Sequence, residues 1–294
     1  MSVLTPDLLG GVGPDAVWRG MTTVAGSWIG GGANQAAMKE IYGVGSDIFS
    51  AMVTVDIIVA NLWMAVLLLM AGNAKKIDQR TGADTSAINE LRLKVEEFER
   101  KHSRTPMLND IMVICAIGFG VTGFAHIVAD TVTPYMVANH PELQKLSFHS
   151  KFFWMIVTAS IIGIALSFTK LRKIEAVGAS KIGSAFLYFL IASIGLHMDV
   201  TKIVDAPIFF VLGGIWMLIH ASLMLGVAKL IKAPLFYMAV GSQANVGGAA
   251  SAPVVASAFH PSLAPVGVLL AVLGYAIGTF AAWFCGQILR TIAS

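Results

Sequence analysis

The chain has 294 residues, of which 56% are hydrophobic and only 13% are charged, and its mean hydropathy is +0.75. A soluble domain carries about 25% charged residues, so this composition excludes an ordinary soluble protein and indicates an integral membrane protein. The net charge of +3 gives no reason to expect nucleic acid as a partner. Cys115 and Cys285 both lie inside apolar stretches, without the spacing of a disulfide framework or a zinc site.

Long apolar stretches separated by polar connections predict about eight membrane segments of roughly 20 residues each. In chain order they are 17–41, 46–72, 108–137, 152–169, 182–198, 207–228, 234–258 and 263–291. We therefore expect an all-α polytopic membrane protein. The stretch 108–137 is long and rich in glycine, and the sequence leaves open whether it is a plain span or a re-entrant one.

The stretch 73–107 is of a different kind, because it holds eight basic residues. Ile88, Leu91, Val95 and Phe98 recur in it at helical spacing, which predicts a surface amphipathic helix in a connector between two halves of the chain. If Arg19 is cytoplasmic and every segment spans, sixteen basic residues fall on one side and three on the other. The positive-inside rule then predicts that the connector and the C-terminus are both cytoplasmic.

Two glycine-rich polar breaks interrupt the apolar segments 17–41 and 234–258. The first runs from Gly26 to Ala36 and the second from Gly241 to Ser251, and each precedes a long apolar segment. An offset of about 216 residues superposes the two breaks and the segments after them. A repeated pair of glycine-interrupted segments indicates the midplane binding site of a secondary transporter.

The repeat predicts three regions: 1–72 as the end of a first repeat, 73–107 as the connector, and 108–294 as a second repeat. Four apolar segments precede the second break but none precedes the first, so we expect an N-terminal half-repeat to be missing from this sequence. Eight simple spans would make the two broken segments run in the same direction, whereas an inverted repeat needs them antiparallel. The sequence does not resolve this conflict.

Asp56 is the strongest candidate for a functional residue. It lies ten residues into the apolar run that begins at Ser46, about 15 Å deep at 1.5 Å per residue. A carboxylate at that depth costs at least about 2.5–3.5 kcal/mol, so it needs a cation, a proton or a polar partner. Sodium is the candidate metal at Asp56; the alternative is a structural ion pair, or a protonated Asp56 bonded to a neighbouring helix. Thr54 and Asn61 lie seven residues apart, on one face of the predicted helix, and would supply further oxygens.

The breaks themselves are rich in small polar side chains that suit sodium or a small solute. These candidate ion- or substrate-binding residues are Ser27, Asn34 and Gln35 in the first break and Ser242, Gln243, Asn245 and Ser251 in the second. The alternative is that the glycines serve only close helix packing. His126, His197 and His220 are scattered over three segments, and we expect packing or interfacial roles for them.

Known catalytic motifs are absent. Gly118–Gly123 matches the dinucleotide-binding pattern, but no strand precedes it and it sits in an apolar run. The sequence has no Walker motif, no His-Glu-x-x-His and no nucleophile elbow. We therefore expect neither an enzyme nor a protein that needs a cofactor other than the coupling ion.

Several motifs resemble those of the DUF819 family of bacterial membrane proteins, over essentially the whole chain. They are Gly26–Asn34, Phe152–Trp154, Ser167–Thr169, Ala192–Gly195, Ser242–Gly248 and Leu270–Gly278. The resemblance places the chain near the cation:proton antiporters and the bile-acid and glutamate sodium symporters, and it implies a location in the bacterial inner membrane. It implies an inverted-repeat fold with two crossed, discontinuous helices, and an ion-binding aspartate on the helix after the first crossed helix, where Asp56 stands.

The function expected from these features is ion-coupled secondary transport, driven by Na⁺ or H⁺, of a small polar or anionic solute by alternating access. The alternatives are a sodium:proton antiporter without an organic substrate, and a membrane scaffold or sensor that transports nothing. The partners expected are the lipid bilayer and the solute, with a homodimer left open.

Overall fold

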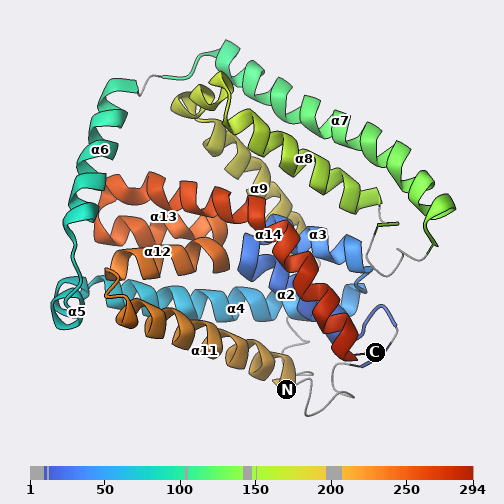
Figure 1. Ribbon diagram of the computed structural model, residues 1–294, viewed down its shortest axis with the longest axis horizontal. Helices are drawn as coiled ribbons and strands as arrows, with labels where there is room; N and C mark the ends of the chain where they lie inside the picture. Colours follow the sequence, from blue (N-terminus) through green and yellow to red (C-terminus); the bar gives the residue numbers. More distant parts are fainter. Residues whose placement is uncertain are drawn as a thin grey trace.

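The structure, a computed structural model, describes residues 10–11, 13–102, 105–141, 148–149, 151–196 and 207–293. The described residues form helices joined by turns, without any strand. The protein is therefore an all-α polytopic membrane protein (Figure 1). The helices are α2 (Val17–Gly30), α3 (Gly32–Tyr42), α4 (Ser46–Ala71), α5 (Ala74–Thr81), α6 (Ser86–His102), α7 (Leu108–Asn139), α8 (Lys151–Ser167), η2 (Lys170–Val177), α9 (Ala179–Gly195), α11 (Pro207–Leu230), α12 (Leu235–Val246), α13 (Gly248–Phe259), η3 (Pro261–Leu263) and α14 (Ala264–Ala293).

Each of the eight predicted apolar segments corresponds to one helix or to one pair of helices. Among the described residues, α4, α7 and α11 are long and apolar enough to cross a membrane, and α8 with η2 would add a fourth span despite a bend of 92° between them. The stretch left open by the sequence, 108–137, is one continuous helix, α7, even though it contains Pro134. The connector contains two helices, α5 and α6, and the Ile88–Leu91 face of α6 packs on the core.

The first glycine break lies at the tip of a helical hairpin. Gly31 separates α2 from α3, and its φ of +78° is one that glycine adopts far more readily than any other residue. The Trp18 and Tyr42 rings, 6.0 Å apart, meet at the open end of the hairpin. A Cβ on Gly26 would lie 2.6 Å from the Asn34 carbonyl oxygen, so the two helices also touch near the tip. Hence α2 and α3 run antiparallel, and we call this pair hairpin 1.

The second break is built in the same way. Gly247 separates α12 from α13, and Gly248 after it has a φ of +60°. Phe236 and Phe259 stack edge to face at the open end, with ring centroids 5.4 Å apart, and Gln243 bonds Ser251 near the tip. We call this pair hairpin 2.

These hairpins correct the expectation of two crossed, interrupted spans. The glycine breaks occur where the sequence places them, but each chain segment turns back at its break instead of continuing across. Each half has 11–14 residues and reaches about 16–21 Å, so no single half crosses the hydrocarbon core, which is about 30 Å thick.

The two hairpins enter from opposite ends of the molecule. The open end of hairpin 1 lies beside the end of α14, where the Tyr42 hydroxyl donates to the Trp283 carbonyl oxygen at 2.5 Å. The open end of hairpin 2 lies beside the connector, where the Leu235 N–H donates to Asp78 at 2.8 Å. The tips converge between them. This antiparallel arrangement resolves the directional conflict in the sequence and fits an inverted repeat of a hairpin joined to a long helix.

The connector and the C-terminus consequently lie at opposite ends of the molecule (Figure 1). This arrangement differs from the one expected if both lie on the cytoplasmic side, and the orientation of each in the membrane stays a prediction. The expectation assumed that every segment spans, whereas each hairpin returns to its own side and reverses the direction of the helices after it. The expected division at residues 72 and 107 stays a prediction.

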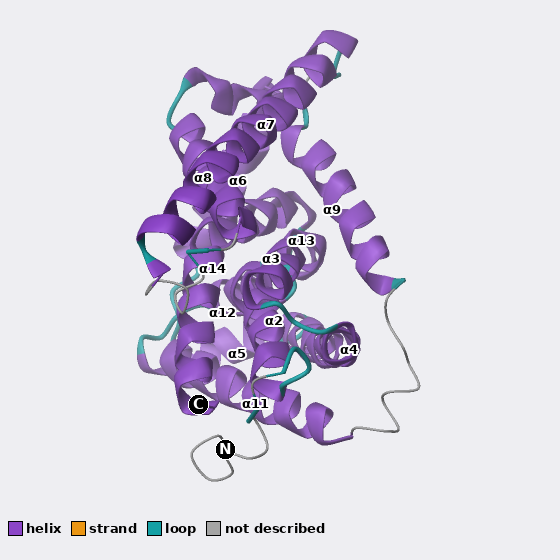
Figure 2. Cartoon of the chain, turned by 90° about the vertical axis from the view of Figure 1, so that its right-hand side faces the viewer, coloured by secondary structure: helices purple, strands orange, loops and turns teal. Residues whose placement is uncertain are grey.

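Helix α14 has a face of small residues that lies against both hairpins. Gly267 abuts the Ala252–Pro253 backbone of hairpin 2, with 2.7 Å between a Cβ placed there and the Ala252 oxygen. A Cβ on Gly30 of hairpin 1 would lie 2.8 Å from the Gly278 Cα. Small residues at these contacts let the backbones of two helices approach closely. This close packing supports helix association in lipid, where no hydrophobic driving force acts between helices. On the far side of the hairpins from α4 and α11, helices α7 and α8 form an outer layer (Figure 2).

Candidate functional site

Asp56 lies in the middle of α4 and is held by the tip of hairpin 1. Its Oδ2 accepts hydrogen bonds from Ser27 Oγ at 2.7 Å and from Gln35 Nε2 at 3.0 Å, and its Oδ1 accepts one from Trp28 Nε1 at 2.6 Å. Only 7% of Asp56 is exposed, and Ser27 and Gln35 are buried as well. All three partners are neutral, so Asp56 is not a member of an ion pair within the part of the chain that the structure describes.

The hairpin geometry explains why these side chains converge. Ser27 and Trp28 lie in the last turn of α2, whereas Gln35 lies in the first turn of α3, on the other side of the glycine break. The turn at Gly31 brings both ends to the same point of α4. The carboxylate therefore bonds both arms of hairpin 1 at once.

Asn34 joins the same hairpin to α14 rather than to Asp56. Its Nδ2 donates to the Gly30 carbonyl oxygen at 2.8 Å, and its Oδ1 accepts from Thr279 Oγ1 at 2.6 Å. Asn34 therefore satisfies a backbone carbonyl that the helix end leaves without an intrahelical partner. In this position it stabilises the tip.

The predicted residues of hairpin 2 fall into three places. Gln243 Nε2 donates to Ser251 Oγ at 2.7 Å across the tip, and the buried Gln243 Oε1 has no partner among the described residues. Ser242 points the other way, toward α4 and α11, and accepts from Trp63 Nε1 at 2.8 Å. Asn245 is exposed, with its Oδ1 3.5 Å from a Cβ placed on Gly274.

Both tips contact the same turn of α14. The Cβ position at Gly274 lies 3.8 Å from the Ala244 carbonyl oxygen and 3.9 Å from that of Ile29. The two breaks are thus brought together as the repeat predicted. The candidate site consists of the Asp56 network and of the residues around Gly274, where the two tips meet, with Asn245 beside it.

Each tip has a serine and a glutamine side chain at matching positions, but only the pair in hairpin 1 has a carboxylate partner. Ser27 and Gln35 are eight residues apart, as are Gln243 and Ser251, and 243 − 27 and 251 − 35 both equal 216. The serine and the glutamine have exchanged places between the repeats. In hairpin 1 the pair binds Asp56, whereas in hairpin 2 the pair closes on itself, because Val272 stands at the position that matches Asp56.

Asn61 and Thr54 do not join the site. Asn61 is exposed and donates to the Ile57 carbonyl oxygen at 2.7 Å, and buried Thr54 donates to that of Ser50 at 2.9 Å. Asn61 lies five residues after Asp56, which turns it about 140° around a helix with 3.6 residues per turn. The prediction of further oxygens from these two side chains is therefore wrong.

Two aromatic N–H groups belong to the site although the sequence patterns did not indicate them. Trp28 lies inside the first break and Trp63 lies seven residues after Asp56 on the same helix face, and each donates to a predicted site residue. An indole N–H can only donate a hydrogen bond, so a tryptophan among buried acceptor groups is the sequence feature that could have indicated these contacts. His220, expected as a packing residue, bonds Ser242 through Nε2 at 2.7 Å.

The partners of Asp56 suit a proton better than a metal ion. The Trp28 N–H cannot coordinate a cation, and the amide of Gln35 presents its NH₂ group to the carboxylate. The arrangement stabilises a carboxylate by three donors, and these bonds would weaken when the carboxylate takes up a proton.

The sequence matches the family described as "Protein of unknown function (DUF819)" over residues 4–292. The chain therefore belongs to this family. No curated protein matches it, and no solved structure matches it either.

Proposed function

We propose that this protein is a secondary active transporter in which protonation of Asp56 is coupled to the movement of a small polar or anionic solute. The observation that carries the proposal is a buried carboxyl group in mid-span whose only described partners are three donors from hairpin 1. Ionisable groups at that depth are rare and mark ion pathways in membrane proteins.

The coupling depends on the charge of the Asp56 carboxyl group. An ionised Asp56 accepts from all three donors, which holds hairpin 1 against α4. A carboxylate has about four lone-pair positions, so a proton takes the remaining one on Oδ1 and removes the charge that strengthens all three bonds. A hydrogen bond to a charged group contributes about 1.5–3 kcal/mol, whereas one between neutral groups contributes about 0.5–1.5 kcal/mol. Uptake of one proton thus weakens the three bonds that keep the hairpin closed.

Opening of a hairpin tip gives the solute a path to the centre. The tips meet at Gly274, and the hairpins extend to opposite ends of the molecule, so movement of one tip opens the centre to one side only. This is the geometry that alternating access needs. Asn245 and the unpartnered Gln243 oxygen provide polar groups beside the solute's position.

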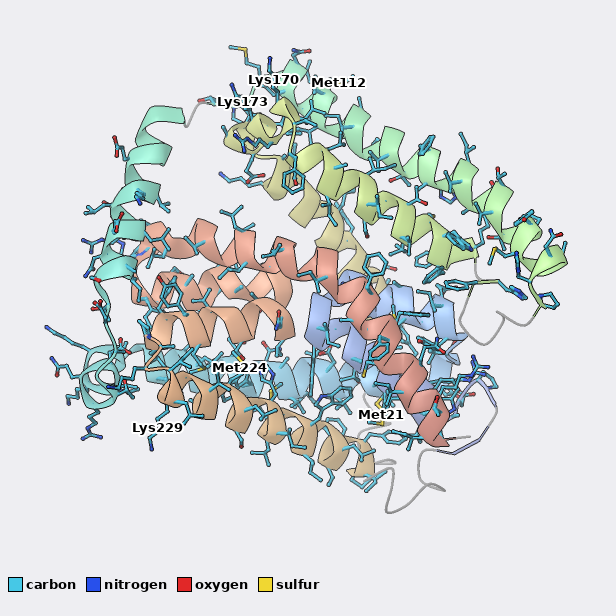
Figure 3. All side chains as sticks on the ribbon, viewed as in Figure 1. Met21, Met112, Lys170, Lys173, Met224 and Lys229 are labelled. Carbon is cyan, nitrogen blue, oxygen red and sulfur yellow. The ribbon has the colours of Figure 1, made fainter. Side chains whose placement is uncertain are left out.

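The connector end is the cytoplasmic end in this proposal. Of the basic residues that the structure describes, four lie toward the end where hairpin 1 opens: Arg19, Lys39, Lys151 and Arg290. Thirteen lie toward the connector end: Lys75, Lys76, Arg80, Arg92, Lys94, Arg100, Lys101, Lys170, Arg172, Lys173, Lys181, Lys229 and Lys232. Figure 3 labels Lys170, Lys173 and Lys229 in that half of the molecule. By the positive-inside rule, the connector faces the cytoplasm of a bacterial inner membrane and the C-terminus faces outward.

The test uses the full chain in proteoliposomes that contain a trapped pH indicator. Pools of amino acids, organic acids and sugars, and then NaCl alone, are added outside under an imposed membrane potential. We expect one addition to move protons in the wild type, and the same addition to move none with Asp56→Asn. Asp47→Asn is the matched control, because Asp47 is exposed in the first turn of the same helix.

A response to NaCl alone would favour the sodium:proton antiporter without an organic solute. Proton movement that survives in Asp56→Asn would show that coupling occurs elsewhere. Failure of every pool and cation to move protons in the wild type would favour the scaffold alternative.

A further inference from the structure

A second polar cluster lies deep in the helices, apart from Asp56. Ser242 Oγ, fully buried in hairpin 2, accepts a hydrogen bond from Trp63 Nε1 of α4 and lies 2.7 Å from His220 Nε2 of α11. The His220 and Trp63 rings are perpendicular, with centroids 6.4 Å apart. His220 is the fourteenth of the 24 residues of α11, so the cluster lies in the middle of a helix that is apolar enough to span.

The cluster has the hydrogen-bond capacity for an added proton. Trp63 N–H can only donate, so it occupies one lone pair of Ser242 Oγ, and the hydroxyl hydrogen remains to be donated to a neutral imidazole Nε2. A charged imidazolium carries hydrogen on both nitrogens and would donate Nε2–H to the second lone pair of Ser242. Rotation of the hydroxyl hydrogen therefore keeps the bond in both states and reverses its direction.

No charged side chain within the described helices fixes His220 in one state. Of the helices packed on α11, α4 carries Asp47 and Asp56, α12 carries no charged residue, and α2 carries Arg19 near its start. Helix α5, beside the Lys229 end of α11, carries Lys75, Lys76, Asp78 and Arg80. Asp56 lies seven residues, or about 10 Å, before Trp63 along α4, and it is bonded to hairpin 1. A neutral hydroxyl is a weak partner for a permanent charge in hydrocarbon, so a charge on His220 belongs to a transient state.

Helix α11 also contacts both hairpins with one face. Trp216, one turn before His220, packs edge to face on Trp28 at 5.6 Å, and Trp28 is the indole that donates to Asp56. His220 contacts hairpin 2 through Ser242. Movement of either hairpin would therefore change the contacts of the same helix, α11.

We propose that His220 is a second proton-binding site, which bonds hairpin 2 through Ser242 and takes up its proton independently of Asp56. The ligand is the proton itself. His220 is suited to exchange it, because one ring nitrogen is bonded to Ser242 while the ring remains partly exposed. The transport cycle proposed above would then move a second proton, or would change rate with pH.

The first test is magnetic resonance of isotope-labelled histidines in the full chain reconstituted in nanodiscs. The His220 signal is the one lost in His220→Gln. We expect it to titrate between about pH 5 and 8, and we expect Ser242→Ala to move its midpoint, because the variant removes the hydroxyl partner. His126→Gln is the matched control, because His126 lies in mid-span on α7 and should leave the His220 signal unchanged. A His220 signal that stays constant over this range, or an unchanged midpoint in Ser242→Ala, would overturn the inference.

The second test separates this site from the proposed function. Asp56→Asn should leave the His220 titration in place, because no hydrogen bond joins the two groups directly. In the vesicle assay, His220→Gln should flatten the pH dependence of transport between about pH 5 and 8 while transport continues. A pH profile identical to the wild type would contradict the inference and leave the role of Asp56 standing. A His220 titration that responds to Ser242→Ala, in a protein that transports nothing, would support the site and contradict the proposed function.

Discussion

A close backbone approach between α14 and hairpin 1 gives a quantitative test of the fold. A Cβ on Gly278 would lie 3.0 Å from the Gly30 nitrogen and 2.8 Å from Asn34 Nδ2, and Gly30 is backbone that cannot move aside cheaply. Gly274, one turn earlier on α14, is a matched control. Its nearest neighbour, Asn245 Oδ1, would lie at 3.5 Å, which is ordinary van der Waals contact.

The two substitutions share one contribution and differ in another. Gly→Ala inside a helix gains about 0.8–1 kcal/mol of intrinsic propensity at either position. Overpacking at Gly278 costs about 1–3 kcal/mol, and Gly274 has no such cost. Because the propensity gain cancels between the variants, we expect Gly278→Ala to be less stable than Gly274→Ala by about 1–3 kcal/mol.

The assay is unfolding of the purified protein in mixed micelles with increasing SDS, monitored by tryptophan fluorescence. Gly274→Ala should unfold at or above the wild-type midpoint, and Gly278→Ala should unfold below it. Equal midpoints for the two variants, or a more stable Gly278→Ala, would refute the close packing of hairpin 1 on α14.

Three further predictions concern the connector and the termini. Asp78→Ala should lower the free energy of unfolding by about 0.5–2 kcal/mol in the same SDS titration, because it removes the acceptor for the Leu235 N–H. Asp78→Asn should lower it by less. The hydrogen bonds from Ser86 hold the pKa of Asp84 below its usual range. The ionised Asp84 therefore stabilises the start of α6 above the unfolded pKa of about 3.9, and this stabilisation is lost as the pH falls through the lower folded pKa. Amide exchange in the first turn of α6 should accelerate in Asp84→Ala but not in Asp84→Asn. Single cysteines at Ser86 and Thr291, in a background without the native cysteines, should react with an impermeant thiol reagent from opposite sides of the membrane, and labelling of both from one side would contradict the antiparallel hairpins.

Hydropathy was sufficient to predict the helices. The free-energy cost of exposing backbone and side chains to lipid or water depends on the local sequence of each apolar segment. Hydropathy could not predict that 17–41 and 234–258 fold back. That depends on contacts such as Trp18 with Tyr42, which join residues far apart in the sequence. The glycines marked the breaks without saying whether the chain turns or continues.

The candidate site could be predicted in part, for similar reasons. Depth and the repeat single out Asp56, Ser27 and Gln35, and the structure brings these three together. Trp28 is not singled out by such patterns, because an aromatic residue in an apolar segment usually serves packing. Asn61 shares a helix face with Thr54, but its angle to Asp56 turns it away from the carboxylate, and spacing from Thr54 alone does not reveal that angle.

The most direct test of the central claim is the protonation of Asp56 itself. Infrared difference spectra of the full chain in lipid, recorded between acid and alkaline pH, detect the C=O stretch of a protonated carboxylic acid in a non-aqueous environment. We expect such a band in the wild type and in Asp47→Asn, its loss in Asp56→Asn, and its shift in Trp28→Phe, where the Oδ1 donor is missing. A band that persists in Asp56→Asn, or a wild type without any band, would contradict the assignment of Asp56 as the proton-coupling residue.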